Sequence, residues 1–188
     1  VLTRWIKANT ECMVNNTSKI GELTNHASTD ALTGLYNRRS LDNEISHILT
    51  EAIENSYTLC VLLIDVDHFK NYNDTLGHLA GDQILIFIGK CLKNTIRPND
   101  TAYRYGGEEF LVLLPDTSFA ESVLVAERIR KAIEKKPIIT ADCEMLPGVT
   151  VSIGIAANRI ESTPISLIES ADAKLYQAKQ AGRNCVKF

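Results

Sequence analysis

The sequence predicts an α/β (α+β) fold, with a central mixed sheet flanked by helices and a linker helix before it. Residues 59–64 form an unbroken apolar run, LCVLLI, which is typical of a strand buried on both faces. Such strand-like runs alternate along the chain with segments whose apolar residues recur at helical spacing. Two strand-like runs also flank Gly106-Gly107, and this pattern indicates a hairpin.

The elements follow one another in a simple order. We expect helices at residues 38–54, 82–96, 118–136 and 164–181, and strands at 57–65, 103–105, 110–114, within 138–157 and at 186–188. Ser118 and Glu121 have capping-box spacing, Pro164 suits a first helical turn, and Gly182 suits a helix end. Residues 66–81 are polar and are expected to form a loop.

Residues 1–28 are predicted to form a separate linker or signalling helix, and residues 29–188 the main domain. In the segment 1–28, apolar residues recur every seven positions, at Ile6, Met13, Ile20 and Ala27. Asn9 and Asn16 occupy companion positions, so the stripe is thin. The pattern predicts a weak parallel coiled coil that pairs two copies, and the alternative is a solvated helix.

Composition narrows the class of protein. The chain has 188 residues, 45% of them hydrophobic and 23% charged, which is ordinary for a globular domain. A net charge of -3 gives no basic field for nucleic acid. Five scattered cysteines fit a reducing cytosol, and no apolar run is long enough for a bilayer. We therefore expect a cytoplasmic domain, and since the sequence starts without Met, the full-length protein could carry an upstream sensor or membrane region.

The end of the buried strand carries two carboxylates, Asp65 and Asp67. At positions i and i+2 they would point the same way in an extended chain. Oxygen ligands at a strand end suit magnesium, which often binds one or two carboxylates together with substrate phosphates. The alternative is a solvated pair of loop acids.

Two further features point to phosphate chemistry. The hairpin tip carries Glu108, which could come beside the Asp65 strand end and divide a metal site between two strands. Lys179 and Arg183 lie four residues apart at a helix end, where they either stabilise the helix terminus or clamp a phosphate, and Lys70 is a further cation. Acidic metal ligands facing cations are the arrangement that phosphoryl or nucleotidyl transfer uses, and no Walker-type loop is present in the sequence.

These residues resemble a known family, the GGDEF-domain diguanylate cyclases. The signature corresponds to Gly106-Gly107-Glu108-Glu109-Phe110, the GGEEF variant, preceded by Arg104-Tyr105. Four other segments are similar to family motifs, in the family's order: residues 30–39 (DALTGLYNRR), 64–70 (IDVDHFK), 73–82 (NDTLGHLAGD) and 171–184 (ADAKLYQAKQAGRN). The resemblance covers residues 30–188.

The resemblance implies a palm-like fold and the condensation of two GTP molecules into cyclic di-GMP, with release of two pyrophosphates. It implies that Asp65, Glu108 and the Val66 carbonyl bind Mg2+, for which Mn2+ is a possible substitute. It also implies that Asn73, Asp82 and His78 bind guanine. Lys70, Lys179, Arg183 and the amides near His68 and Phe69 would then hold the triphosphate. Lys70 would offset transition-state charge, and Glu108 would help to deprotonate the attacking hydroxyl.

Each domain would hold one GTP, so the resemblance further implies an active homodimer. It also implies product inhibition by cyclic di-GMP at Arg97-Pro98-Asn99-Asp100, with Arg128 as a secondary contact. Leu124 stands where some relatives carry a further arginine, which weakens that secondary half. Without the resemblance, Arg97 and Asp100 read as a helix-end charge and a turn residue.

Two other functions stay open at this stage. A catalytically inactive relative that only binds GTP or cyclic di-GMP would have lost motif residues, and none is lost here. A cyclase or polymerase acting on another nucleotide is disfavoured, because the Asp82 carboxylate can accept the two N–H groups of guanine and adenine offers no such pair.

Overall fold

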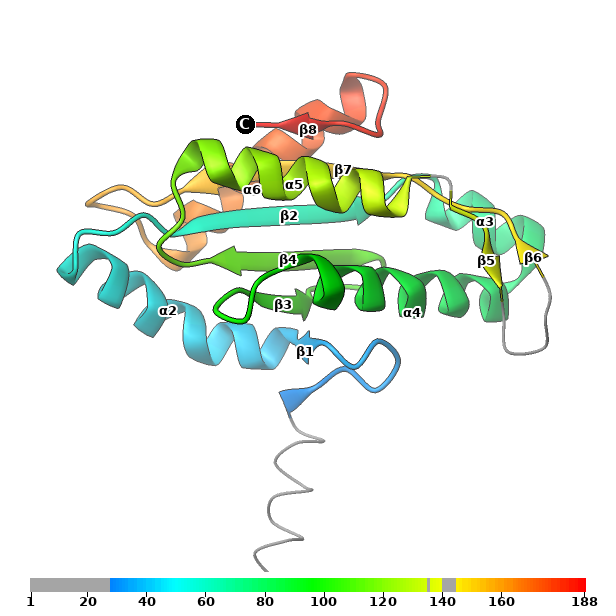
Figure 1. The fold of residues 1–188 in the computed structure, drawn as a ribbon, viewed down its shortest axis with the longest axis horizontal. Coiled ribbons are helices and arrows are strands. Elements are labelled where there is room, and N and C mark those ends of the chain that lie inside the picture. Colours follow the sequence, from blue (N-terminus) through cyan, green and yellow to red (C-terminus); the bar gives the residue numbers. More distant parts are fainter. Residues whose placement is uncertain (1–27, 135, 140–144) are drawn as a thin grey trace, which may run out of the picture.

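The computed structural model describes residues 28–134, 136–139 and 145–188, so the predicted linker helix at 1–27 lies outside the described residues. A six-stranded mixed sheet crosses the molecule in the order β1-β3-β4-β2-β7-β8 (Figure 1). Its strands are β1 (Tyr36–Asn37), β2 (Cys60–Val66), β3 (Thr101–Arg104), β4 (Glu109–Leu114), β7 (Val151–Ala157) and β8 (Val186–Lys187). The β1–β3 and β7–β8 pairs are parallel and the others antiparallel, which confirms the mixed sheet.

Two pairs of helices enclose the sheet between two apolar cores. Helices α4 (His78–Thr95) and α5 (Phe119–Ile133) pack on one face, and α2 (Arg38–Glu54) and α6 (Pro164–Gln180) on the other. Figure 1 shows α5 in front of the sheet and α6 behind it. The alternation along β2 explains both cores, since Leu62 and Ile64 belong to the first and Val61 and Leu63 to the second.

The central position of β2 agrees with the prediction from its composition. All seven residues of the strand are buried, and it pairs with β4 on one side and β7 on the other. A strand covered on both faces needs no polar alternation. Its last residues, Asp65 and Val66, therefore lie at the C-terminal end of a central strand.

Helix α6 lies unusually close to β7. A Cβ atom on Gly154 would come within 2.1 Å of the Ala171 carbonyl oxygen and 2.3 Å of the Leu175 nitrogen. Only glycine leaves room for this backbone approach. The contact fixes the C-terminal half of α6, and with it Lys179, against the sheet.

The prediction of a polar loop over residues 66–81 was wrong. Helix α3 (Phe69–Leu76) occupies most of it, and α4 begins at His78, four residues earlier than expected. Helix α3 buries only Phe69, so its sequence has no apolar period to indicate a helix. Gly77, at a φ of 86°, separates the two helices.

The strand material expected within residues 138–157 includes a second, two-stranded sheet that was not predicted as a separate unit. Its strands β5 (Ile138–Ile139) and β6 (Met145–Leu146) are antiparallel and too short to carry a pattern. In the described part of the chain, no helix has both the length and the apolar character that crossing a membrane requires.

Candidate active site

The site is built around Asp65 at the end of β2. Asp65 is 6% exposed and lies on the α6 side of the sheet, where the Lys179 Nζ is 2.8 Å from its Oδ2. Burial raises the pKa of the Asp65 carboxyl, and the contact with Lys179 opposes that rise without cancelling it. The charge of Asp67 adds to the rise in the Asp65 pKa, and the charge of Arg183 lowers it.

Glu108 is the second carboxylate at this edge. Its carbonyl oxygen accepts a hydrogen bond from the Val66 amide at 3.3 Å, and the next residue, Glu109, pairs with Asp65 across the β2–β4 ladder. Burial raises the pKa of Glu108, and the nearby Asp65 charge raises it further. The two acids therefore repel one another, although Lys179 lies beside them. Such a pair favours an additional cation.

The hairpin expected around Gly106-Gly107 is present and carries Glu108. Four residues, 105–108, link β3 to β4, and neither Gly106 nor Gly107 has a positive φ. The Arg104 guanidinium donates to the Gly107 carbonyl oxygen at 2.8 Å and also binds the Asp30 carboxylate at 3.1 Å. This pair anchors the hairpin tip. Arg104 and Asp30 were both in motifs identified in the sequence, but no local pattern connected them.

Asp30 is held as a carboxylate by its partners. Its Oδ1 accepts hydrogen bonds from the amide and hydroxyl of Thr33, at 2.8 Å and 2.7 Å. Burial tends to raise the pKa of Asp30, but the Thr33 hydrogen bonds and the Arg104 charge together bring it below its usual value. Asp30 therefore remains charged and able to hold Arg104 at physiological pH.

Asp67, the second carboxylate of the i, i+2 pair, is held by hydrogen bonds within the protein. Its Oδ1 accepts from the Ser152 hydroxyl at 2.7 Å. Its Oδ2 accepts from the Thr150 hydroxyl at 2.7 Å and from the backbone amide of Asn184 at 3.0 Å. Both oxygens are used within the protein, so Asp67 has a structural environment that its spacing from Asp65 could not indicate.

The cations expected to bind the triphosphate lie at the end of α6 and at the start of α3. Lys179 lies in the last turn of α6 and Arg183 in the turn after it, at a φ of 64°. His68, at a φ of 60°, precedes α3 and makes no side-chain hydrogen bond to that helix end, and Lys70 is exposed in its first turn. The first turn of α3 therefore has no side-chain cap from His68, and uncapped amides at a helix N-terminus can bind phosphate.

Asn73 and Asp82 lie across the α3–α4 turn from one another. The Asn73 Oδ1 is buried and has no hydrogen-bond partner among the described residues. It lies so close to Gly81 that a Cβ atom there would be only 1.9 Å away. Exposed His78 begins α4 near this turn. An orphaned acceptor in a glycine-made space is the environment that a ligand N–H donor would complete.

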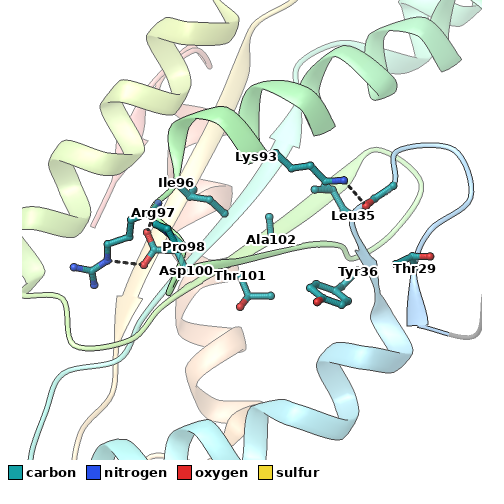
Figure 2. A pocket seen from close by; sticks show the side chains of 11 residues that line it. Thr29, Leu35, Tyr36, Lys93, Ile96, Arg97, Pro98, Asp100, Thr101 and Ala102 are labelled. Atoms are coloured by element: carbon teal, nitrogen blue, oxygen red, sulfur yellow. Dashed lines mark hydrogen bonds and ion pairs between the residues drawn. The ribbon is translucent and has the colours of Figure 1, made fainter. Parts of the chain in front are cut away.

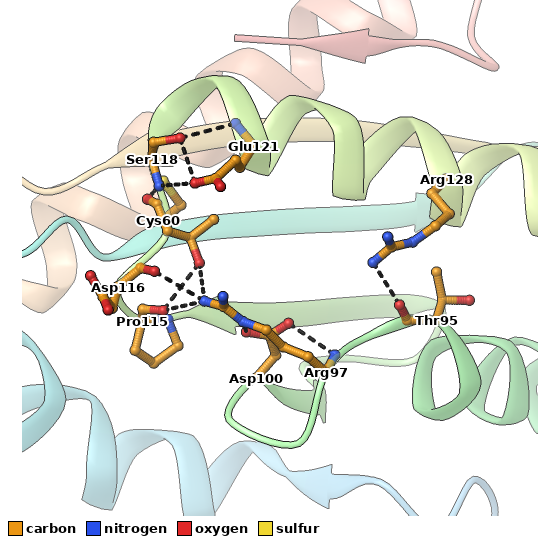
Figure 3. A network of polar contacts seen from close by, with 10 residues as sticks. Cys60, Thr95, Arg97, Asp100, Pro115, Asp116, Ser118, Glu121 and Arg128 are labelled. Atoms are coloured by element: carbon orange, nitrogen blue, oxygen red, sulfur yellow. Dashed lines mark hydrogen bonds and ion pairs between the residues drawn. The ribbon is translucent and has the colours of Figure 1, made fainter.

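Arg97 and Asp100 form a closed unit on another surface (Figure 3). The Arg97 Nε is 2.9 Å from Asp100 Oδ1, and Asp100 has a side chain only 1% exposed. The Arg97 Nη2 also donates to the Pro115 and Asp116 carbonyl oxygens at 2.6 Å and 3.1 Å. The guanidinium therefore ties the α4–β3 turn to the turn that precedes α5.

Arg128 on α5 shares this surface with Arg97 (Figure 3). Its Nη2 donates to the Thr95 carbonyl oxygen at 2.8 Å, at the end of α4. A cavity of about 520 Å³ adjoins the same region. Figure 2 shows Arg97, Pro98 and Asp100 toward one end of it and Lys93, Leu35 and Tyr36 toward the other. Its volume suits part of a nucleotide-sized ligand.

Sequence reasoning named Asp67, Arg104 and Asn184 but did not predict the contacts through which they hold the site. Asp67, Arg104 and Asn184 connect segments between three and 117 positions apart, and Gly81 makes room for Asn73. The described residues contain no group of three or more His, Cys, Asp or Glu side chains that could hold a metal by themselves. Two carboxylates, Asp65 and Glu108, are nevertheless sufficient where a substrate supplies further oxygen ligands.

Residues 27–185 match the family model described as diguanylate cyclase, GGDEF domain. The chain is 41% identical over 181 residues to the response regulator PleD of Caulobacter vibrioides, covering 96% of this chain and 39% of that protein. It is 42% identical over 175 residues to diguanylate cyclase A of Treponema denticola, covering 91% of this chain and 46% of that protein. The chain thus spans less than half the length of these relatives.

A solved structure of similar extent is the coiled coil and GGDEF domain of DgcB from Caulobacter crescentus in complex with c-di-GMP. It is 32% identical in sequence to this chain and superimposes with a TM-score of 0.92. The alignment covers 99% of this chain and 98% of that one. The similarity therefore extends over the whole sequence and not only over its short motifs.

Proposed function

The chain belongs to the GGDEF-domain family of diguanylate cyclases, and from this membership we propose that it condenses two GTP molecules into cyclic di-GMP, releasing two pyrophosphates. The observation that best supports this proposal is the meeting of Asp65, Glu108 and Lys179 at one sheet edge. Two mutually repelling acids beside cations are suited to a nucleoside triphosphate and a divalent metal.

We propose Asp65 and Glu108 as the side chains that hold magnesium, with the Val66 carbonyl as a further oxygen ligand. The raised pKa values of both acids support this, because each carboxylate would be stabilised by a nearby cation. Bound magnesium supplies charge neutralisation for the triphosphate and the developing pyrophosphate. Manganese, which accepts the same oxygen ligands, is expected to substitute.

The chain's own cations would bind the triphosphate. Lys179 and Arg183 approach from the end of α6, and Lys70 from the first turn of α3. The amides near His68 and Phe69 offer donors at a helix N-terminus, where phosphate binding is favourable. Lys70 would also offset negative charge that develops in the transition state.

Guanine would be recognised in the α3–α4 turn. Asn73 Oδ1 is a buried acceptor without a partner among the described residues, so a guanine N–H donor would satisfy it. The Asp82 carboxylate would accept the remaining guanine donors, and His78 lies at the rim. This combination favours guanine over adenine.

Catalysis would require two domains facing one another in a homodimer. The 3′-hydroxyl of each GTP attacks the α-phosphorus of the other, the new P–O bond forms as the bond to pyrophosphate breaks, and the hydroxyl proton is lost. Glu108, with its raised pKa, is the side chain proposed to help remove that proton. Juxtaposition of the two substrates supplies much of the acceleration.

We also propose that cyclic di-GMP inhibits the enzyme at Arg97, Asp100 and Arg128. Arg97 and Arg128 face one surface, and the cavity beside Arg97 has space for part of the product. Asp100 is buried behind Arg97, so its first role would be to orient the guanidinium; direct binding of guanine by Asp100 requires that ion pair to open. An upstream sensor or membrane region would set the input signal in a longer protein.

The test is incubation of the protein with GTP and magnesium, followed by chromatography of the products. Cyclic di-GMP and pyrophosphate in a one-to-two ratio are expected, and they should disappear in Asp65→Ala and Glu108→Ala with the fold retained. Binding of GTP without product would instead support an inactive sensor. Turnover of ATP in place of GTP would contradict the guanine assignment.

A further inference from the structure

The buried carboxylate of Asp67 is used by neither the metal nor the guanine site proposed above. The residue is 5% exposed, between β2 and α3, and it lies two positions after a proposed metal ligand. All of its hydrogen-bond donors come from elsewhere in the chain: two hydroxyls at β7 and one amide from the turn after α6. The amide is the informative partner, because it belongs to the turn that carries Arg183.

The turn after α6 has an unusual backbone. Gly182, Arg183 and Asn184 have φ values of 105°, 64° and 46° in succession. The Arg183 amide donates to the Ala178 carbonyl oxygen at 3.1 Å, which together with the left-handed glycine forms a Schellman-type helix end. That motif accounts for Gly182, but left-handed conformations at two following non-glycine residues are unfavourable unless neighbouring groups hold them.

Asn184 is held on both of its sides. Its amide donates to Asp67 Oδ2 at 3.0 Å, and its side chain accepts from Arg130 Nη1 at 2.8 Å and donates to Glu134 Oε1 at 2.6 Å. Asp67 on one side, and Arg130 and Glu134 at the end of α5 on the other, therefore hold Asn184 between them. Arg183, directly before it, is left exposed and close enough for its charge to act on Asp65.

We propose that Asp67 is a positioning residue for the triphosphate site, which acts by holding the Asn184 backbone amide and thereby keeps the turn that carries Arg183 next to the end of β2. The inference rests on the proposed function, since it assigns Arg183 to the substrate phosphates. The hydrogen bond from the Asn184 backbone amide to Asp67 ties this turn to the end of β2, so loss of Asp67 would free the turn that carries the Arg183 guanidinium. Asp67 touches no substrate itself.

A double-mutant cycle separates this role from a general contribution to folding. Asp67→Ala and Arg183→Ala should each weaken binding of a non-hydrolysable GTP analogue by about tenfold, the effect of one charge-assisted hydrogen bond. In the Arg183→Ala background, Asp67→Ala should change the affinity by no more than about twofold, because the group it positions is already absent. Full additivity of the two losses would overturn the proposal.

Two controls keep the outcome interpretable. Ser152→Ala removes a hydrogen bond of 2.7 Å from the same carboxylate without touching the turn, so it should lower the melting temperature while leaving analogue affinity unchanged. Asp67→Asn is the second variant if Asp67→Ala fails to fold, and it should give a smaller loss with the same dependence on Arg183. An affinity loss as large in Ser152→Ala as in Asp67→Ala would also refute the assignment.

Hydrogen exchange of the Asn184 amide gives a readout that does not involve nucleotide. That amide should be protected in the wild type and should exchange faster in Asp67→Ala, with unchanged protection in the centre of β2. Unprotected exchange in the wild type would overturn the proposed anchor directly. Protection lost in the variant, in a protein that binds no GTP, would instead retain the anchor and reject the function on which the inference rests.

Discussion

Replacing Gly81 by alanine should uncouple stability from substrate binding. Gly81 lies in the first turns of α4, where alanine is favoured over glycine by about 1 kcal/mol. Its new Cβ would lie 1.9 Å from Asn73 Oδ1 and 2.9 Å from Asn73 Cγ, both atoms of one rotatable side chain. Asn73 can turn away, and Phe69 Cζ at 3.2 Å needs only a small shift, so the free energy of unfolding should stay nearly unchanged.

The same movement removes the proposed guanine acceptor. Loss of one hydrogen bond to guanine, with no replacement, corresponds to about 1.4 kcal/mol and thus to about a tenfold higher KM for GTP. The rate at saturating GTP should change less, because neither Gly81 nor Asn73 belongs to the metal site proposed at Asp65 and Glu108. Steady-state synthesis of cyclic di-GMP and thermal denaturation of the same preparations provide the two measurements.

Asn73→Ala is the matched control. It should raise KM by a similar factor, and Gly81→Ala should add almost nothing in that background, since its effect passes through the Asn73 side chain. A wild-type KM in Gly81→Ala would refute the reasoning, because the buried oxygen could then not be the group that reads guanine.

Three further expectations concern other parts of the molecule. Gly154→Ala should destabilise the protein by about 2–3 kcal/mol in urea unfolding, because its Cβ meets the Ala171 carbonyl and no side chain can yield. The control Gly107→Ala, with no atom within 4 Å of its Cβ, should leave the free energy of unfolding nearly unchanged. Arg97→Ala should abolish product inhibition and cost about 1–2 kcal/mol of stability through its lost contacts; inhibition equal to that of the wild type would reduce Arg97 to a structural residue. Removing residues 1–27 should lower the mass in solution and the activity together, and if it alters neither, the coiled-coil prediction is wrong.

The sequence predicted most of the fold because most of its elements carry their own signals. The apolar run of β2 indicated burial on both faces, and Ser118 with Glu121 indicated the start of α5, where the structure has a complete capping box. Helix α3 carried no such signal, since seven of its eight residues are not buried and their order has no period. Its existence depends on the docking of Phe69, which is a tertiary contact.

The candidate site divides in the same way. Residues proposed to meet substrate lie in short motifs, and the chain itself brings Glu108 and Asp65 together through one strand pairing. Arg97 could be read only as a helix-end charge or an inhibitory contact, because its bonds to Pro115 and Asp116 span 18 and 19 positions. No spacing rule reaches that far without the folded chain.

Asp65 and Asp67 illustrate why residue type and spacing do not decide a role. Both are buried aspartates at the end of one strand, two positions apart. Burial raises the pKa of Asp65, and the Lys179 ammonium group at 2.8 Å opposes that rise without cancelling it. Asp67 meets two hydroxyls and an amide, which satisfy both of its oxygens without any cation. Asp65 is therefore the carboxylate that we propose for a metal, whereas Asp67 is already satisfied by groups of the protein, and that difference is set by contacts with α6 and β7, more than eighty residues further along the chain.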